Sequence, residues 1–158
     1  TIKNVMKKYI LALLITGSIS GMSCEENHTI PEDTIIRYGT SFGFCAGYCK
    51  NTISLTSTSF NFEKSSWTDK DTYPDIHCNG AFSEWNNLSD KIHLKNFNKM
   101  DEIIGCPDCA DGGAEWIEIT SGETSHKVTF EYNKSPDVFK SYIEILRSKL
   151  EEIDSTCE

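Results

Sequence analysis

The sequence has little positive charge. Its 158 residues include 15 lysines and arginines but 24 aspartates and glutamates, so the formal net charge is −9. Such a chain repels the phosphates of nucleic acids and anionic lipids, which proteins bind through surplus lysine and arginine side chains. We therefore expect no nucleic-acid partner, and we interpret the negative charge as an aid to solubility.

Recognisable catalytic and cofactor motifs are also lacking. The sequence contains no Gly-x-Ser-x-Gly elbow, no His-Glu-x-x-His helix and no phosphate-binding loop. Its four histidines, at positions 28, 77, 93 and 126, follow no metal-ligand spacing. We predict no catalytic residue, no metal site and no cofactor. A hydrolase that uses a pair of carboxylates has no such motif and is kept as an alternative.

The longest apolar run is too short to span a bilayer. Residues Tyr9–Ile15 follow Met6-Lys7-Lys8 and precede small and polar residues, which is the pattern of a secretory signal peptide. A membrane-spanning helix needs about 20 apolar residues. We expect residues 1–23 to be this signal peptide. Its removal takes away three lysines and no acid, which leaves 12 basic against 24 acidic residues, or −12.

Cys24 follows this segment directly. The arrangement resembles the lipobox of bacterial lipoproteins, in which the signal is cut before a cysteine whose thiol is then lipidated. Ser23 fits the position before the cut, whereas Gly21 stands where leucine is usual. The alternative is ordinary cleavage that leaves a free thiol. The resemblance implies a lipoprotein of the outer membrane, anchored through Cys24.

A short polar stretch follows the cysteine. Residues 24–33 are acidic and include Pro31, which predicts a tether between the lipid and a folded domain. Acidic residues at this place resemble the surface-export signals of Bacteroidota lipoproteins, which implies exposure on the outer face of the cell. We expect residues 34–158 to form a single domain, because 135 residues after cleavage suffice for one core.

Six further cysteines predict disulfide bonds. An even number in an exported protein is typical of a disulfide framework. Cys45 lies close to Cys49, and Cys106 lies close to Cys109. Bonds within these two pairs would leave Cys78 to bond with Cys157. The rival arrangement bonds Cys45 and Cys49 to Cys106 and Cys109. The six are Cys45, Cys49, Cys78, Cys106, Cys109 and Cys157.

The close cysteine pairs also allow two other functions. A thiol-disulfide protein would use Cys106-Pro107-Asp108-Cys109, but redox motifs of this spacing open a helix, and here Asp108 and Asp111 disfavour a thiolate. Zinc would use the same pair together with Cys45 and Cys49. An oxidising compartment favours disulfides over both. Calcium bound by Asp108, Asp111 and Glu115 is a weaker hypothesis, because their spacing is not that of an EF-hand.

Hydrophobic periodicity predicts the elements. Alternating residues indicate a strand over 34–40 and hairpins over 51–63 and 117–132, and helical spacing indicates helices over about 81–92 and 136–153. Ser135 is expected to cap the last helix, with Pro136 at its first position. Residues 64–80 are expected to be a long surface loop. The fold class is α+β, with an antiparallel sheet of about four to five strands packed against two helices, order β-ββ-α-ββ-α, stapled by disulfides.

The order of elements resembles a family of uncharacterised lipoprotein domains of Bacteroidota type. The family opens on Cys-Phe-Gly-x-Cys-Pro before a β-hairpin; here Cys45, Gly47 and Cys49 match, while Ala46 and Lys50 differ. The resemblance covers roughly residues 34–153. It implies the fold and the compartment, and it carries no activity to transfer.

Function is predicted only in outline. We expect a non-enzymatic binding or interaction module, with the membrane as one partner through Cys24 and an unknown protein or glycan as the other. Trp67 and Tyr73, in the long polar loop, are the candidate binding surface, since exposed aromatic rings stack on sugars and peptides. Trp116 flanks a strand and is expected in the core.

Overall fold

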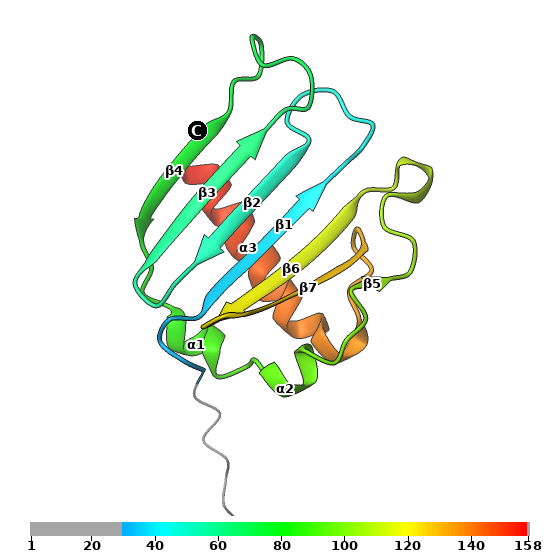
Figure 1. The fold of residues 1–158 in the computed structure, drawn as a ribbon. Coiled ribbons are helices and arrows are strands. Elements are labelled where there is room, and N and C mark those ends of the chain that lie inside the picture. The colour runs from blue at the N-terminus through cyan, green and yellow to red at the C-terminus, as the bar shows by residue number, and fades with distance from the viewer. Residues whose placement is uncertain (1–29, 158) are drawn as a thin grey trace, which may run out of the picture.

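A seven-stranded β-sheet forms the centre of the computed structural model, which describes residues 30–157 (Figure 1). In chain order its strands are β1 Ile35–Ser41, β2 Lys50–Leu55, β3 Ser59–Ser65, β4 Ile76–Ala81, β5 Ile103–Ile104, β6 Ala114–Ser121 and β7 Thr124–Glu131. Their order across the sheet is β4-β3-β2-β1-β6-β7-β5. Only β5 and β7 run parallel, so the sheet is mixed, and its first strand is the middle one.

One long helix covers one face of this sheet. Helix α3, Lys140–Thr156, crosses behind the strands in Figure 1, while the short helices α1, Trp85–Ser89, and α2, Leu94–Phe97, lie near one end of the sheet. Two 3-10 turns, Cys109–Asp111 and Asp137–Phe139, precede β6 and α3. The opposite face of the sheet carries no helix in the described residues.

The core lies between the sheet and α3 because alternate side chains of each strand point to that side. Burial of these apolar groups supplies the main driving force of the fold. The buried set includes Ile36 and Tyr38 of β1, Ile53 and Leu55 of β2, Ile117 and Ile119 of β6, Val128 and Phe130 of β7, and Tyr142, Ile143, Leu146, Leu150 and Ile153 of α3.

The predictions that rest on strong apolar periodicity, two hairpins and the C-terminal helix, are confirmed. Strands β2 and β3 form an antiparallel hairpin in which Leu55 pairs with Phe60. Strands β6 and β7 form the second hairpin, in which Ile117 pairs with Val128. The C-terminal helix is present, and its apolar stripe is buried from Phe139 to Ile153.

The predicted fold class is wrong. The sheet has seven strands in a mixed arrangement, in place of four to five antiparallel ones, and only one of the helices is long. The missed strand β4 falls within the expected surface loop 64–80 and reads Ile-His-Cys-Asn-Gly-Ala. Asn and Gly have low strand propensity, and pairing with β3 overrides that preference. Strand β5 has two residues, too few for any periodic signal.

The boundaries of the two predicted helices also differ from the expectation. The helix expected over about 81–92 shrinks to the five residues of α1, because β4 continues to Ala81. At the C-terminal helix, Pro136 has an extended ψ of 137° and precedes a 3-10 turn, and no side chain caps α3. A 3-10 turn has three residues per turn, so it shifts the helical phase. Val138, in this 3-10 turn, is 81% exposed as a result.

The expected signal peptide 1–23, the lipidation site Cys24 and most of the tether 24–33 lie outside the described residues. The first described residue, Ile30, is buried against the core. Within residues 30–157, no helix is both long and apolar enough to cross a membrane.

Candidate functional site

Three loops meet at one end of the sheet. Strand β1 is antiparallel to β2 and β6, and β3 is antiparallel to β2 and β4. The connections 42–49 and 66–75 and the segment 105–113 before β6 must therefore lie at the same end (Figure 1). Residues 30–34 enter β1 at the other end. We call the three segments the distal loops.

Two of the distal loops are closed by disulfides. Cys45 is bonded to Cys49, with their Cα atoms 5.7 Å apart, and Cys106 to Cys109, with their Cα atoms 5.5 Å apart. The prediction of disulfide bonds is confirmed, and each close pair is bonded within itself. A short closed loop has few conformations, so its neighbouring side chains are held in place.

Polar contacts join the loops to one another. The Asp108 carboxylate accepts hydrogen bonds from the backbone N–H of Gly43, at 3.0 Å, and of Gly113, at 3.1 Å. The indole N–H of Trp67 donates to the Phe42 carbonyl oxygen at 2.7 Å. Loop 42–49 is therefore tied to both of its neighbours, and the distal loops form one connected surface.

The exposed part of this surface is aromatic. Phe44 is 83% exposed and Trp67 is 51% exposed. Tyr73 is half-buried, with its ring edge-on to that of Tyr48 at 5.5 Å, and the Tyr48 hydroxyl donates to the Pro74 carbonyl at 3.1 Å. Of the two residues singled out from the sequence, Trp67 is exposed for contact and Tyr73 supports the loop. Phe44 was missed, although its place beside the cysteine turn was a signal.

The distal loops are acidic around these rings. Asp69, Asp71, Asp75, Asp108 and Asp111 carry five negative charges and Lys70 one positive charge, which sums to −4. Lys70 and Asp75 form an ion pair. A partner with basic groups around an apolar patch would complement this surface.

The backbone of segment 105–113 is strained. Asp108, Ala110 and Asp111 have φ of 58°, 53° and 59°, the left-handed region that residues other than glycine rarely occupy. Each such residue costs about 1–3 kcal/mol, and strained residues concentrate at functional sites. The hydrogen bonds from the N–H groups of Gly43 and Gly113 to Asp108, together with the Cys106–Cys109 disulfide, hold the segment in this conformation.

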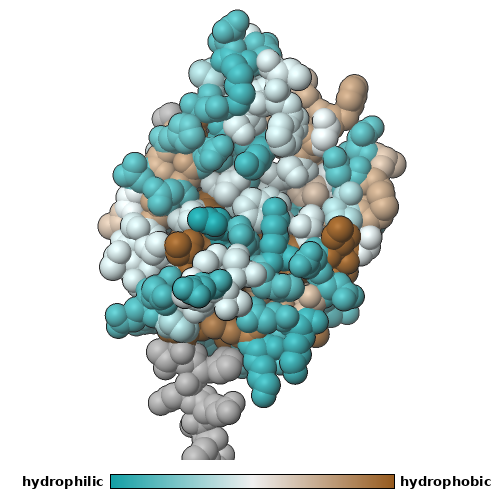
Figure 2. Space-filling model, in the orientation of Figure 1, coloured by the Kyte–Doolittle hydropathy of each residue, from teal (hydrophilic) through white to brown (hydrophobic). Residues whose placement is uncertain are grey.

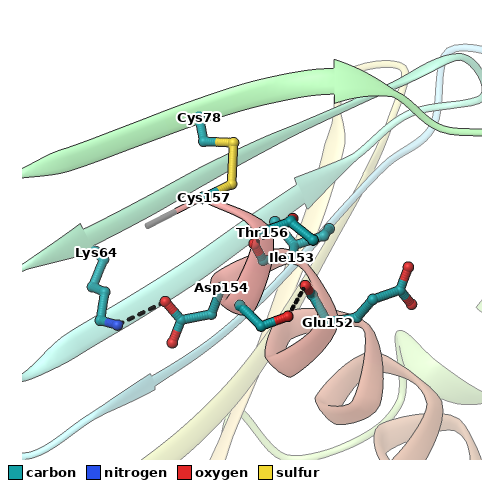
Figure 3. The surroundings of a disulfide bond; sticks show 8 residues. Lys64, Cys78, Glu152, Ile153, Asp154, Thr156 and Cys157 are labelled. Carbon is teal, nitrogen blue, oxygen red and sulfur yellow. Dashed lines mark hydrogen bonds and ion pairs between the residues drawn. A yellow bond between two sulfur atoms is a disulfide. The ribbon is translucent and has the colours of Figure 1, made fainter.

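The third disulfide lies away from these loops. Cys78 of β4 is bonded to Cys157, which directly follows α3, with Cα atoms 5.8 Å apart (Figure 3). Beside it, the Lys64 amino group contacts the Asp154 carboxylate at 2.7 Å. These bonds join the edge of the sheet to the end of the helix.

The cysteines offer no metal ligands in this arrangement, since all six are bonded in pairs. Among residues 30–157, no three or more His, Cys, Asp or Glu side chains are grouped to hold a metal ion. Cys109 begins a 3-10 turn of three residues. A redox-active thiolate is typically stabilised at the N-terminus of a longer helix, and no such helix follows this cysteine pair in the described residues.

Glu115 does not belong to the acidic turn, contrary to the calcium hypothesis. Its carboxylate is fully buried on the helix side of β6 and forms a bidentate pair with the Arg147 guanidinium, with two bonds of 2.9 Å. It also accepts from the Tyr38 hydroxyl and, at 2.9 Å, from the Asn133 N–H. Burial and the hydrogen bond to Glu115 raise the pKa of the Tyr38 hydroxyl far above its usual range. The acceptors of Glu115 are occupied, so the cluster holds α3 to the sheet.

The open face of the sheet is polar, as the hydrophilic colours of Figure 2 show. Trp116, expected in the core, lies half-buried on this face, over Gly39. A Cβ at position 39 would lie 2.7 Å from the indole ring, so glycine makes room for it. The Lys127 amino group lies over the ring, 4.2 Å from its centre. Trp116 thus contacts both the backbone at Gly39 and the Lys127 amino group.

Comparison with known proteins adds no identity to this geometry. The sequence matches no family model and no curated protein. The fold and the distal loops therefore carry the functional argument.

Proposed function

We propose that this chain is an exported, lipid-anchored protein of the bacterial outer membrane that binds a protein partner through its distal loops. The observation that carries the proposal is the exposure of Phe44 and Trp67 on loops closed by disulfides and joined by hydrogen bonds. Aromatic side chains held in place lose little entropy on binding, which is why they dominate the energetics of many protein interfaces.

The direction of the loops supports this proposal. Cys24 precedes Ile30 by six residues in the sequence, and residues 30–34 enter the sheet at the end opposite the distal loops. An anchored molecule would then present Phe44 and Trp67 away from its own membrane. The resemblance to lipoprotein domains of Bacteroidota type agrees with this compartment, and it favours exposure at the cell surface.

The chemistry of the surface favours a protein over a glycan. Phe44 offers an apolar ring without polar atoms, and the acidic residues around it suit basic side chains of a partner. A sugar site would require polar groups directed at hydroxyls beside the ring. The Trp67 indole N–H is instead used within the molecule.

The experiment compares capture of envelope proteins by residues 25–158 immobilised with intact disulfides. We expect the wild type to retain a partner that the Phe44→Ser/Trp67→Ser variant loses, by at least about tenfold, because interface aromatics contribute roughly 2 kcal/mol or more each. Ile103→Ser is the matched control: Ile103 is 68% exposed, against 83% for Phe44, and lies in β5, outside the distal loops.

Two outcomes would contradict the proposal. Equal loss of capture in Ile103→Ser would mean that exposed apolar area alone binds envelope proteins. Retention of the partner by the Phe44→Ser/Trp67→Ser variant would move the interface elsewhere. Capture that is abolished by free oligosaccharide would replace the protein partner with a glycan.

A further inference from the structure

A cavity of about 280 Å³ lies between the α2 segment and the start of α3. Its lining comes from residues 91–100 and 138–142, two stretches far apart in the chain. Both α2 and the start of α3 lie toward the end of the sheet where β1 begins, away from the distal loops (Figure 1). Its volume is near the lower limit of small-molecule sites, roughly 300 Å³. A ligand of this cavity must therefore be small.

The polar part of the lining is positively charged, in a protein whose net charge is −9. Lys91, His93 and Lys99 line the cavity, and none of its lining residues is acidic. Lys91 and Lys99 form no ion pair within the described part of the chain. Two ammonium groups without carboxylate partners attract an anion more strongly than paired ones do.

The rest of the lining is apolar. Met100, Phe139 and Tyr142 form part of the wall, and exposed Val138 lies at its edge. Tyr142 is only 2% exposed, and its hydroxyl has no hydrogen-bond partner among the described residues. The wall thus offers apolar contact together with a donor that the protein does not use.

The start of α3 adds to the positive potential. This 17-residue helix has no side-chain cap at its N-terminus, and Ser141 in its first turn lines the cavity. The Lys140 N–H is bonded to the Asp137 carbonyl of the preceding 3-10 turn, and the helix dipole favours a negative charge at this place. The dipole therefore acts in the same sense as Lys91 and Lys99.

We propose that this cavity binds a small amphipathic anion, with an anionic head group beside Lys91 and Lys99 and a short apolar chain against Met100, Phe139 and Tyr142. Neither part of the lining alone selects such a ligand: the lysines would accept any anion, and the apolar wall any apolar molecule. The two together, in a volume this small, favour a single chain. The site is independent of the distal loops and of the function proposed for them.

The test is titration of residues 25–158 with octanoate, followed by NMR chemical shifts and by calorimetry. We expect saturable binding in the range of about 0.1–1 mM, with the largest shifts at Met100 and Tyr142. Octylammonium, which has the same chain and the opposite charge, and acetate, which has the head group alone, are each expected to bind at least about tenfold more weakly.

Lysine variants separate this site from general attraction to positive charge. Lys91→Gln and Lys99→Gln are each expected to weaken octanoate binding about five-fold. Lys95→Gln is the matched control, because Lys95 is exposed on α2 but does not line the cavity. Vesicles containing phosphatidylglycerol form a second arm, in which competition with octanoate would identify a membrane lipid as the source of the anion and its absence a soluble ligand.

Several results would overturn the proposal. Equal binding of octylammonium would show that charge plays no part. Equal weakening by Lys95→Gln would show that the attraction is not local to the cavity. Failure of octanoate to saturate below about 10 mM would show that the cavity is not a site for this class of ligand.

Discussion

Single residues connect the two layers of this molecule, and Glu115 is the clearest case. It lies in the core with its two oxygens bonded to Arg147, Tyr38 and Asn133. Arg147 is only partly exposed, so little solvent screens the pair. A buried charge keeps such a pairing because the loss of either partner leaves the other without compensation.

Glu115→Gln is expected to lower the free energy of unfolding by about 3 kcal/mol, since it breaks a buried ion pair and leaves Arg147 unpaired. Glu118→Gln, three residues along β6, should lower it by less than about 1 kcal/mol, because its pair with Arg37 at 3.5 Å is partly exposed to solvent. Denaturant unfolding of both variants measures the difference. Equal losses would show that Glu115 contributes no more than a surface charge.

Two buried tyrosines should make the protein sensitive to alkali. Burial raises the pKa of Tyr142 well above its usual value, and burial together with Glu115 raises that of Tyr38. Above a pH of about 10 the unfolded chain therefore loses protons that the folded chain retains. Protons released only by the unfolded state favour unfolding. The two tyrosines therefore leave the free energy of unfolding unchanged below that pH and lower it as the pH rises above it.

The expected fall is about 1.4 kcal/mol per pH unit for each buried tyrosine. Free energies of unfolding measured from pH 8 to 11.5 should show a smaller slope for Tyr142→Phe than for the wild type, by about this amount for one tyrosine. The same substitution should not destabilise the protein near pH 8, because the hydroxyl removed has no partner in the described residues. An unchanged alkaline slope would contradict the assignment.

At the scale of elements, the disulfide between Cys78 and Cys157 joins parts that are distant in sequence. It closes a segment of 79 residues and holds the end of α3 against edge strand β4 (Figure 3). Cys106 and Cys109, by contrast, are three residues apart. Because a cross-link restricts the unfolded chain more when it closes a longer loop, the two bonds should differ in their effect on stability.

The Cys78→Ser/Cys157→Ser variant is expected to lose about 4–5 kcal/mol of stability on the chain-entropy estimate, against about 2 kcal/mol for Cys106→Ser/Cys109→Ser. Unfolding in denaturant without reductant compares the two, and each variant keeps the other two disulfides. A loss that is as small for the first variant as for the second would show that the long bond does not restrict the unfolded chain.

Elements with a strong apolar period could be predicted from the sequence. The hairpins around Leu55–Phe60 and Ile117–Val128 and the helix that buries Leu146 were found because one face of each is apolar. Strand β4 could not be predicted in this way, because it is an edge strand whose residues gain their conformation from pairing with β3. Parallel pairing of β5 with β7 depends on contacts across the fold, which no local pattern records.

The candidate site could be predicted in part. Trp67 stood out because a tryptophan in a polar loop has no local reason to be buried. Phe44 and the role of Asp108 became visible only when the antiparallel order of β1, β2 and β6 placed their loops together. The cavity beside Lys91 and Lys99 likewise joins segments about 40 residues apart along the chain, and nothing in either segment points to the other.

At the scale of the whole molecule, the two ends of the sheet have different chemistry. One end carries the distal loops, acidic and aromatic. The other receives residues 30–34 and holds the cavity lined by Lys91 and Lys99. If Cys24 is lipidated, as proposed, the chain enters the sheet from the anchored side at the second end, and the distal loops lie at the opposite end.

Cys24→Ser is expected to abolish anchoring of the full chain in a host that processes lipoproteins. The wild type should partition with membranes and incorporate labelled palmitate, whereas the variant should do neither. Cys106→Ser/Cys109→Ser should keep the label, which shows that the modified thiol is not one of the paired cysteines. Release of the unmodified wild type as a soluble protein would contradict lipidation.

The position of Cys157 near the end of α3 determines when its disulfide with Cys78 can form. If the chain is exported from its N-terminus, as proposed, β1 to β4 are delivered first and β6, the second neighbour of the middle strand, only later. Until α3 emerges, the apolar side of this half-sheet has nothing to cover it, and an uncovered sheet is prone to aggregate. Because Cys157 lies 79 residues after Cys78 and directly follows α3, this disulfide could form only in chains whose α3 has been delivered.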